Sequence, residues 1–207
     1  MTDKPQDGRG GTGKRRALNA HFCPKCGVAV PADVKRCQSC GFTGADSVEM
    51  FSEAAPPLMP VLDAAGLWDA EELKVIEVAR EKLRRRFPQF KFHVCTVMLP
   101  EGTSLPAFGF WLLNVCPMYV GETEEDRAWS VLFLIDVKSG NATVVPGYRA
   151  EPWISDEDWK KVMSSCVAPW RSGKTAQTVI RFFETSAAFL EQSWRTRGSR
   201  RTSKSRR

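Results

Sequence analysis

An unbroken run of apolar residues stands near the middle of the chain, at positions 131–135. The run is too short for a typical helix and rich in residues that favour strands, so it predicts a strand buried on both faces. A turn follows that Gly140 can close with a positive φ, and residues 142–145 return as a partner strand. Pro146 ends that strand, and Gly147 lets the chain bend away. We therefore expect this hairpin to lie at the centre of a sheet.

Residues 90–99 form a second strand candidate, again with apolar side chains on both faces. His93 and Cys95 are two residues apart in this segment and therefore share one face of the strand. A cysteine and a histidine can act as nucleophile and base, but the sequence offers no third group that would orient them. We therefore interpret both side chains as ordinary core residues.

Helical patterns surround these strands. Asp69 and Glu72 have the spacing of a capping box, after which apolar residues recur at helical spacing. Residues 105–115 are apolar almost all round, which predicts a helix buried between layers or facing a partner. Ser155 is placed to cap a further helix, and residues 174–194 carry one apolar face along a last helix. Doubly buried strands among such helices predict an α/β fold in which amphipathic helices flank a small central sheet.

Four of the seven cysteines form two pairs near the N-terminus, in the sequences CPKCG and CQSCG. Each pair can turn two thiolates toward one point, and the glycine after it permits the tight backbone. Cys23, Cys26, Cys37 and Cys40 therefore predict a closed tetrahedral zinc site, in preference to a redox dithiol. The intervening segment has few apolar residues, so we expect this module to need its metal to fold. A complete cysteine set leaves no position for His21, which we interpret as a solvated neighbour.

Length and composition limit the class of protein. With 207 residues, of which 43% are apolar, the chain can hold one ordinary domain and a small extra module. No run of about 18 apolar residues exists, and the N-terminal residues lack the apolar segment of a signal peptide. Paired cysteines in a reducing compartment serve metal binding rather than disulfides. We therefore expect a cytoplasmic protein without a transmembrane segment.

The formal net charge of +6 is unevenly distributed along the chain. Residues 1–20 carry five basic and two acidic groups, and residues 195–207 carry seven basic groups and no acidic group. The residues between them hold 18 basic against 22 acidic side chains, so the body is mildly acidic. Within it, the acidic segment 121–127 predicts a loop. The basic ends cannot bury enough apolar surface to offset chain entropy, so we expect them to be disordered and able to contact acidic proteins, nucleic acid or an anionic membrane surface.

These patterns divide the chain into five parts. We expect a disordered basic arm at 1–20, a zinc ribbon at 21–43, a Pro/Ala-rich linker at 44–66, the α/β/α domain at 67–194 and a disordered basic tail at 195–207. Prolines favour an extended spacer, and nothing in the linker predicts a helix or a strand of its own. We therefore expect the ribbon to move relative to the domain.

Three segments of the domain resemble the TPM domain family, which is related to a thylakoid-lumen acid phosphatase and to several membrane-linked proteins. They are AGLWDAEEL, VLFLID and VPGYRAEPWISDED; the last stands where the family has valine, glycine-tyrosine-glycine, glutamate and a segment ending in threonine or serine and aspartate. The resemblance covers roughly 130 of the 207 residues and implies a three-layer α/β/α sandwich. The cysteine module resembles the short zinc ribbons that commonly stand at one end of bacterial proteins.

The resemblance also implies a candidate site. Family members with phosphatase activity use carboxylates and a bound divalent cation at the sheet rim, and residues 147–148, Glu151 and Asp156 match that pattern by position. Before the central strand the family commonly has Asp-Asn-Gly, whereas this chain has Ala-Trp-Ser at 128–130, with Asp126 as a displaced substitute. A hard cation needs about six oxygen ligands, so this reduced carboxylate set predicts a weak divalent-cation site or none.

We therefore expect a non-enzymatic protein-interaction module with a structural zinc ion, in which the domain docks a protein partner and the ribbon provides a second surface. One alternative is a divalent-cation-dependent phosphatase in which Glu151, Asp156 and Asp126 hold the cation and activate water. A second alternative is a nucleic-acid-binding protein that uses the ribbon and the basic tails. The acidic body and the lack of a defined aromatic surface for RNA count against this second alternative.

Overall fold

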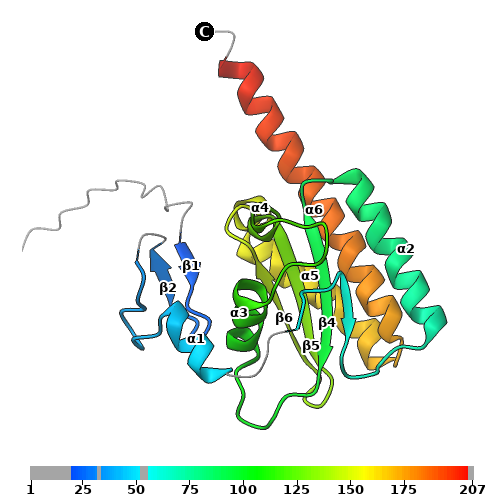
Figure 1. Cartoon of the computed structure of the whole chain (residues 1–207). Coiled ribbons are helices and arrows are strands. Elements are labelled where there is room, and N and C mark those ends of the chain that lie inside the picture. The colour runs from blue at the N-terminus through cyan, green and yellow to red at the C-terminus, as the bar shows by residue number, and fades with distance from the viewer. Residues whose placement is uncertain (1–19, 32–33, 52–55, 205–207) are drawn as a thin grey trace, which may run out of the picture.

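The computed structural model describes residues 20–31, 34–51 and 56–204. Figure 1 shows a central sheet between helices, with a small module beside it. The sheet has the strand order β3 (Val61–Asp63), β4 (Lys91–Val97), β5 (Ser130–Asp136) and β6 (Asn141–Pro146). Strands β3, β4 and β5 are parallel, and β6 is antiparallel to β5. The predicted α/β class, with a small central sheet flanked by helices and a separate cysteine module, is confirmed.

The central hairpin is the predicted one. Every residue of β5 is buried, and β6 returns beside it with Leu132 opposite Val145. Gly140 closes the turn with a φ of 68°, and its amide donates to the Asp136 carbonyl at 2.9 Å. The apolar run therefore occupies an interior strand of the sheet, as the sequence indicates.

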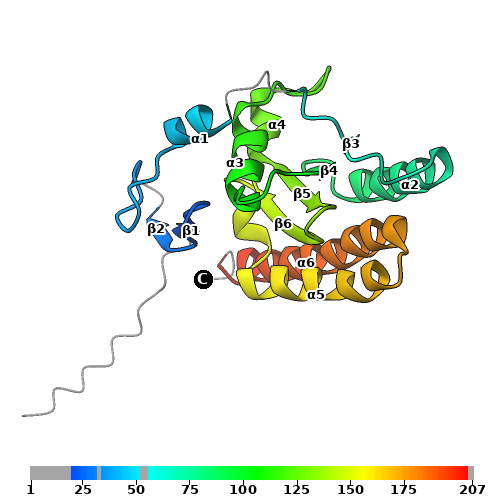
Figure 2. The ribbon, with the colours of Figure 1, turned by 90° about the horizontal axis from the view of Figure 1, so that it is seen from below.

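Alternate residues of β5 serve two separate cores. Val131, Phe133 and Ile135 belong to a large core that is completed by α2 (Ala70–Arg86), α5 (Asp156–Arg171) and α6 (Thr175–Lys204). Leu132 and Leu134 belong to a smaller core, which α3 (Leu105–Val115) completes on the opposite face. Figure 2 shows α3 on one side of the sheet and the α5–α6 pair on the other. The layers follow from the period of two that separates the faces of a strand.

Local signals set the helix ends. The Asp69 carboxylate accepts from the Glu72 amide at 2.8 Å, and the Glu72 carboxylate accepts from the Asp69 amide at 3.3 Å, so the predicted capping box begins α2. Phe87, directly before Pro88, ends the helix. Ser155 caps α5 and accepts from the Asp158 amide at 3.2 Å.

The cysteine module packs against α3. Its strands β1 (Ala20–Phe22) and β2 (Ala29–Pro31) pair antiparallel, and helix α1 (Gly44–Met50) follows them. The Phe42 ring meets the edge of the Phe110 ring at a centroid distance of 6.0 Å, and Phe51 meets Phe108 at 5.2 Å. These contacts partly cover the outer side of α3, where Phe108 and Phe110 are half-buried, and they were not predicted from the sequence.

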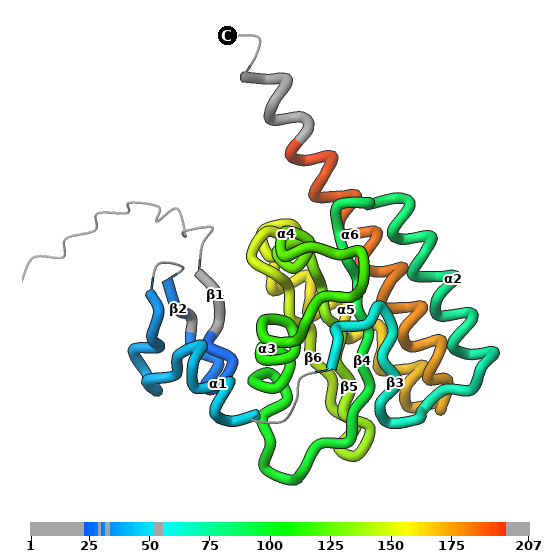
Figure 3. Tube along the Cα trace, in the orientation of Figure 1, coloured from blue at the N-terminus to red at the C-terminus, as the bar shows by residue number. Residues whose placement is uncertain are grey.

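Four segments contain structure that the sequence did not predict; Figure 3 labels α1 and β3 in the first of them. The expected linker 44–66 contains α1, which begins at a capping box between Thr43 and Asp46, and strand β3, which exists through its pairing with β4. The expected loop 121–127 contains helix α4 (Glu124–Ala128), and a 3-10 turn, η1, spans Glu151–Trp153. The tail expected to be disordered from residue 195 continues α6 to Lys204, while the basic arm 1–19 lies outside the described residues.

Gly147 turns the chain at the end of β6 against neighbouring backbone. A Cβ atom at this position would lie 2.5 Å from the Arg127 carbonyl oxygen and 2.6 Å from that of Ala128. Because backbone cannot give way as a flexible side chain can, Gly147→Ala should lower the free energy of unfolding by about 3 kcal/mol. Chemical denaturation followed by tryptophan fluorescence measures this difference. Gly44→Ala is the matched control, since nothing lies within 4 Å of its Cβ position; equal stability of the two variants would contradict the prediction.

Candidate functional site

The four paired cysteines converge on one point. The sulfur atoms of Cys23, Cys26, Cys37 and Cys40 all lie within 4.8 Å of one another, and all four thiols are free. The Cys23 sulfur is 3.6 Å from that of Cys40, and the Cys26 sulfur is 3.6 Å from that of Cys37. Four sulfurs at about 2.3 Å from a tetrahedral zinc ion are about 3.8 Å apart. The group therefore has the spacing that a four-coordinate metal ion requires.

Two equivalent turns bring the cysteine pairs together. The Gly27 amide donates to the Cys23 carbonyl at 2.8 Å, and the Gly41 amide donates to the Cys37 carbonyl at 2.8 Å. Both glycines have positive φ, 71° and 75°, a conformation that strains other residues. This is the structural reason for a glycine after each cysteine pair in the sequence.

Backbone amides around the sulfurs favour negative charge. The Cys40 amide, together with that of Ser39 and the neighbouring thiols, lowers the pKa of Cys37 to about 6. The Phe42 amide lowers the pKa of Cys40, but burial and hydrogen bonds with the other three thiols outweigh it and raise that pKa to about 12. A metal ion binds thiolates, and amides directed at sulfur support the charge that remains after binding.

The module has a very small core of its own. Within the described side chains, its buried cluster consists of Cys23, Val30, Cys37 and Phe42. Burial of two apolar side chains besides the cysteines contributes only a few kcal/mol, which is less than the entropy cost of ordering the segment. The fit of the cysteine group to a metal ion therefore also explains how this segment can fold.

The carboxylates of the predicted rim site do not meet. Glu151 lies in η1 near Asp156 at the start of α5; burial first, and the charge of Asp156 second, raise the pKa of Glu151. Asp126 lies on α4, where it accepts from the Thr123 amide at 2.8 Å and lies 3.3 Å from the Lys91 ammonium. Throughout the described residues, the cysteine cluster is the only group of three or more potential ligands that converge.

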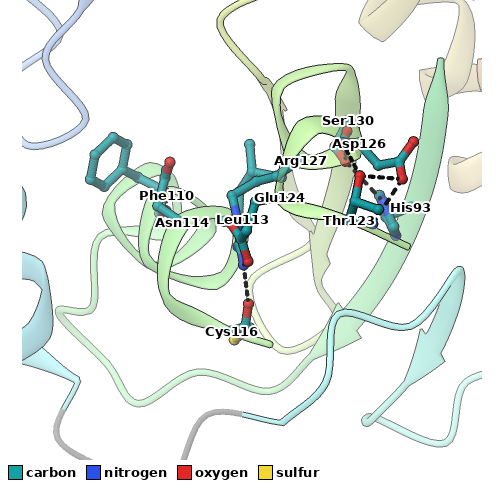
Figure 4. Close-up of polar contacts among 10 residues, drawn as sticks. All are labelled: His93, Phe110, Leu113, Asn114, Cys116, Thr123, Glu124, Asp126, Arg127 and Ser130. Atoms are coloured by element: carbon teal, nitrogen blue, oxygen red, sulfur yellow. Dashed lines mark hydrogen bonds and ion pairs between the residues drawn. The ribbon is translucent and has the colours of Figure 1, made fainter. Parts of the chain in front are cut away.

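Ion pairs occupy the rim instead. Besides the Lys91–Asp126 pair, the Arg149 guanidinium donates to the Glu125 carboxylate at 2.6 Å. Figure 4 shows Asp126 directed toward Thr123 and close to Ser130. The Arg127 guanidinium donates to the carbonyls of Leu113 and Cys116 at the end of α3, where backbone carbonyls run out of partners within the helix. The acidic segment before the central strand therefore serves to join α4 to α3.

His93 and Cys95 are both buried, as the sequence indicates. The His93 Nδ1 atom is 3.1 Å from the Met59 carbonyl oxygen, and its Nε2 atom is 3.2 Å from the Ser130 hydroxyl (Figure 4). Burial lowers the pKa of His93 to about 4 and raises the pKa of Cys95 to about 12. The imidazole is therefore neutral and the thiol is protonated at pH 7, so this pair does not provide a thiolate nucleophile.

A polar hollow that the sequence reasoning missed lies between α2 and the start of β4. It has a volume of about 240 Å³, and its charged lining includes Arg80, Arg84, Lys91 and Glu122. Burial raises the pKa of Glu122, and its Oε2 atom has no hydrogen-bond partner within the described part of the chain. No short motif joins these residues, which are up to 42 positions apart, so only the folded chain could bring them together.

The structure predicts that the purified protein holds one tightly bound metal ion per chain. Cys37→Ser should remove a quarter of the ligands and abolish stoichiometric binding, because a closed four-sulfur site has no spare ligand. Cys166→Ser is the matched control, since Cys166 is a buried cysteine of α5 outside the cluster. Elemental mass spectrometry of the purified variants measures the metal content. A Cys37→Ser protein that still holds one ion per chain would contradict the assignment.

His93 should make folding stability depend on pH. Its folded pKa of about 4 lies below the ordinary 6.5, so only the unfolded chain gains a proton between these values. The free energy of unfolding therefore falls as the pH drops from 6.5 to 4, with a maximal slope of about 1.4 kcal/mol per pH unit. Between pH 6.5 and 5, the wild type should lose about 1.6 kcal/mol more than His93→Gln. Denaturant titrations at each pH measure the difference, and parallel pH profiles would refute it.

None of the helices that the structure describes is long and apolar enough to cross a membrane. A scan against protein-family models and a search of curated proteins both find no match. Solved structures do match. The NMR structure of the BA42 protein from the psychrophilic bacterium Bizionia argentinensis is 14% identical, covers 60% of this chain and 82% of its own, and has a TM-score of 0.52. An N-terminal domain of a protein from P. gingivalis is 20% identical, covers 71% of this chain and 88% of its own, and has a TM-score of 0.53. At these identities the likeness shows the fold alone.

Proposed function

We propose that this chain is a non-enzymatic protein-interaction module, in which a structural zinc ribbon is fixed to a TPM-like α/β/α domain. The observation that carries the proposal is an open apolar groove between α2 and α6, with a volume of about 540 Å³. Val75 and Val78 of α2 are 47% and 49% exposed there, and Ile180 of α6 forms the opposite wall. We call this feature the α2–α6 groove.

The chemistry of the groove favours a helical protein partner. Two half-exposed valines in a concave surface can bury apolar side chains that a partner inserts between the two helices. Lys74 and Lys82 flank the apolar lining, and Glu71 adds a single negative charge. An amphipathic helix with acidic residues beside its apolar face therefore complements both the shape and the charge of the groove.

Zinc is the metal that we propose for the four cysteines, because a tetrahedral set of four thiolates is its usual structural site. The ribbon offers a second surface through Lys25 and Val28, which are exposed within and just after the first cysteine pair. All seven cysteines are free, which supports a reducing compartment and hence a cytoplasmic protein. The three-layer fold and the VPGYRAE segment at the sheet rim support the relation to the TPM family.

The phosphatase alternative has less support. It retains the neighbouring pair Glu151 and Asp156, whereas Asp126 is bound to Lys91 and to the start of α4. Two carboxylates supply fewer oxygen ligands than a hard divalent cation usually takes from a protein. The ion-paired rim is the arrangement that we expect of a binding module.

Replacing the two exposed valines tests the proposal. Val75→Asp/Val78→Asp places two negative charges in the α2–α6 groove. Binding of an acidic amphipathic helix should then weaken at least 100-fold, because the new carboxylates lose water on binding and repel the acidic residues of the partner. Val167→Asp on α5 is the matched control, because that valine is 43% exposed outside the groove. A photo-crosslinking residue at Val78 in the full chain identifies the partner, whose affinity for each variant is then measured by calorimetry.

The same proteins also test the alternative. We expect no turnover of a phosphate ester with Mg²⁺ by the wild type. The proposal fails if the crosslinked partner binds all three proteins equally, or if the wild type hydrolyses the ester and Glu151→Gln abolishes that activity.

A further inference from the structure

An exposed indole marks the point where α6 leaves the body of the protein. Trp194 is 56% exposed and stacks on Trp153, with ring centroids 5.5 Å apart and an angle of 22° between the rings. Trp153 in turn meets the edge of the buried Phe90 ring at 5.7 Å. Trp194 is therefore the outermost ring of a row that is anchored in the core, so its position is fixed although its surface is open.

Arginine side chains surround this ring row. The Arg197 guanidinium carbon lies 4.3 Å from the centre of the Trp153 ring, and Arg197 also donates to the Pro152 carbonyl. Arg86, at the end of α2, and Arg195 both bind the Glu191 carboxylate and hold the pKa of Glu191 below its ordinary value. One carboxylate thus faces two guanidinium groups, so the surroundings of Trp194 keep an excess of positive charge.

The backbone of α6 continues this basic end away from the domain. The helix extends to Lys204, ten residues beyond Trp194, and Figure 1 shows it projecting past the other elements. Ten helical residues span about 15 Å. Residues 195–204 carry five basic groups and no acidic or apolar side chain. A fixed aromatic ring therefore stands at the base of a strongly cationic helix end.

This combination fits nucleic acid better than a membrane surface. The segment after Trp194 has no apolar side chain to insert between lipids, so membrane binding would rest on one indole and on charge. A flat exposed ring beside guanidinium groups instead matches the two features of a single strand, unstacked bases and a phosphate backbone. Duplex bases stack on each other and leave no face free for an indole.

Further cations lie beside the same ring row. Phe90, which contacts Trp153, also lines the polar hollow that contains Arg80, Arg84 and Lys91. A single-stranded nucleic acid whose base stacks on Trp194 can therefore contact additional positive groups at this end of the molecule. The mildly acidic remainder of the body would repel it, which restricts binding to this end.

We propose that Trp194, Arg195 and Arg197, together with Arg86, form a binding surface for single-stranded nucleic acid. A base stacks on the open face of Trp194, and the guanidinium groups bind the flanking phosphates. This surface is independent of the α2–α6 groove and of the four cysteines, so it adds a second partner class to the proposed function.

Fluorescence anisotropy of labelled twelve-residue oligo(U) and oligo(dT) with the full chain tests the proposal, at salt concentrations from 50 to 300 mM. Both oligomers should bind, since stacking and phosphate contacts are common to RNA and DNA. Trp194→Ala should weaken binding at least tenfold without changing the salt dependence, whereas Trp194→Phe should retain most of the affinity. Arg195→Gln/Arg197→Gln should reduce the slope of log K against log salt concentration by about 1.4, because two phosphate contacts are lost.

Lys160→Gln/Lys161→Gln on α5 is the matched control. Both lysines are exposed and paired with carboxylates, as Arg195 is, and their loss should leave affinity and salt dependence unchanged. Circular dichroism checks that each variant is folded. The proposal is overturned if no oligomer binds at 50 mM salt, if the Trp194 and arginine variants bind like the control, or if duplex DNA or anionic phosphatidylglycerol vesicles bind as tightly as the single strands.

Discussion

Strand β5 has only apolar side chains from Val131 to Ile135, so both faces of the sheet must be covered before the strand can leave water. Helices α2, α5 and α6 cover one face, while α3 contributes the single helix on the other. Because α3 is itself apolar almost all round, its outer side also needs a cover. The cysteine module supplies that cover through Phe42 and Phe51, so the demand for burial that begins at β5 extends to the other end of the chain.

This packing couples the cysteine site to the domain. The module has too few buried side chains to fold alone, so its shape depends on the four converging sulfurs. Phe42 and Phe51 can cover the rings of Phe110 and Phe108 on α3 only when the cysteine module is folded. A metal ion held by the four sulfurs would therefore stabilise both the fold of the module and its packing on α3. A module packed in this way presents its exposed turn in a defined direction relative to the sheet.

Helix α6 connects the α2–α6 groove with the proposed nucleic-acid surface around Trp194. Its first turns complete the large core and place Ile180 in the α2–α6 groove, whereas its last described side chains surround Trp194. The first surface is apolar with basic borders, and the second is basic with one aromatic ring. The sheet rim between α4 and η1, by contrast, has its charges paired by Lys91 and Arg149. The carboxylates of Asp126 and Glu125 at this rim are therefore already paired, whereas both of these surfaces lie on helices.

The sequence alone determined the features that depend on neighbouring residues: the β5–β6 hairpin, the capping box of α2, the bounds of α3 and the two cysteine turns. Such signals lie within a few positions of each other, so spacing reveals them. Only the tertiary structure decided that Asp126 lies apart from the Glu151–Asp156 pair, and that Trp153 stacks on Trp194. It also decided that the three-residue strand β3 pairs with β4. These outcomes depend on the path of the chain between distant residues, which no local pattern encodes.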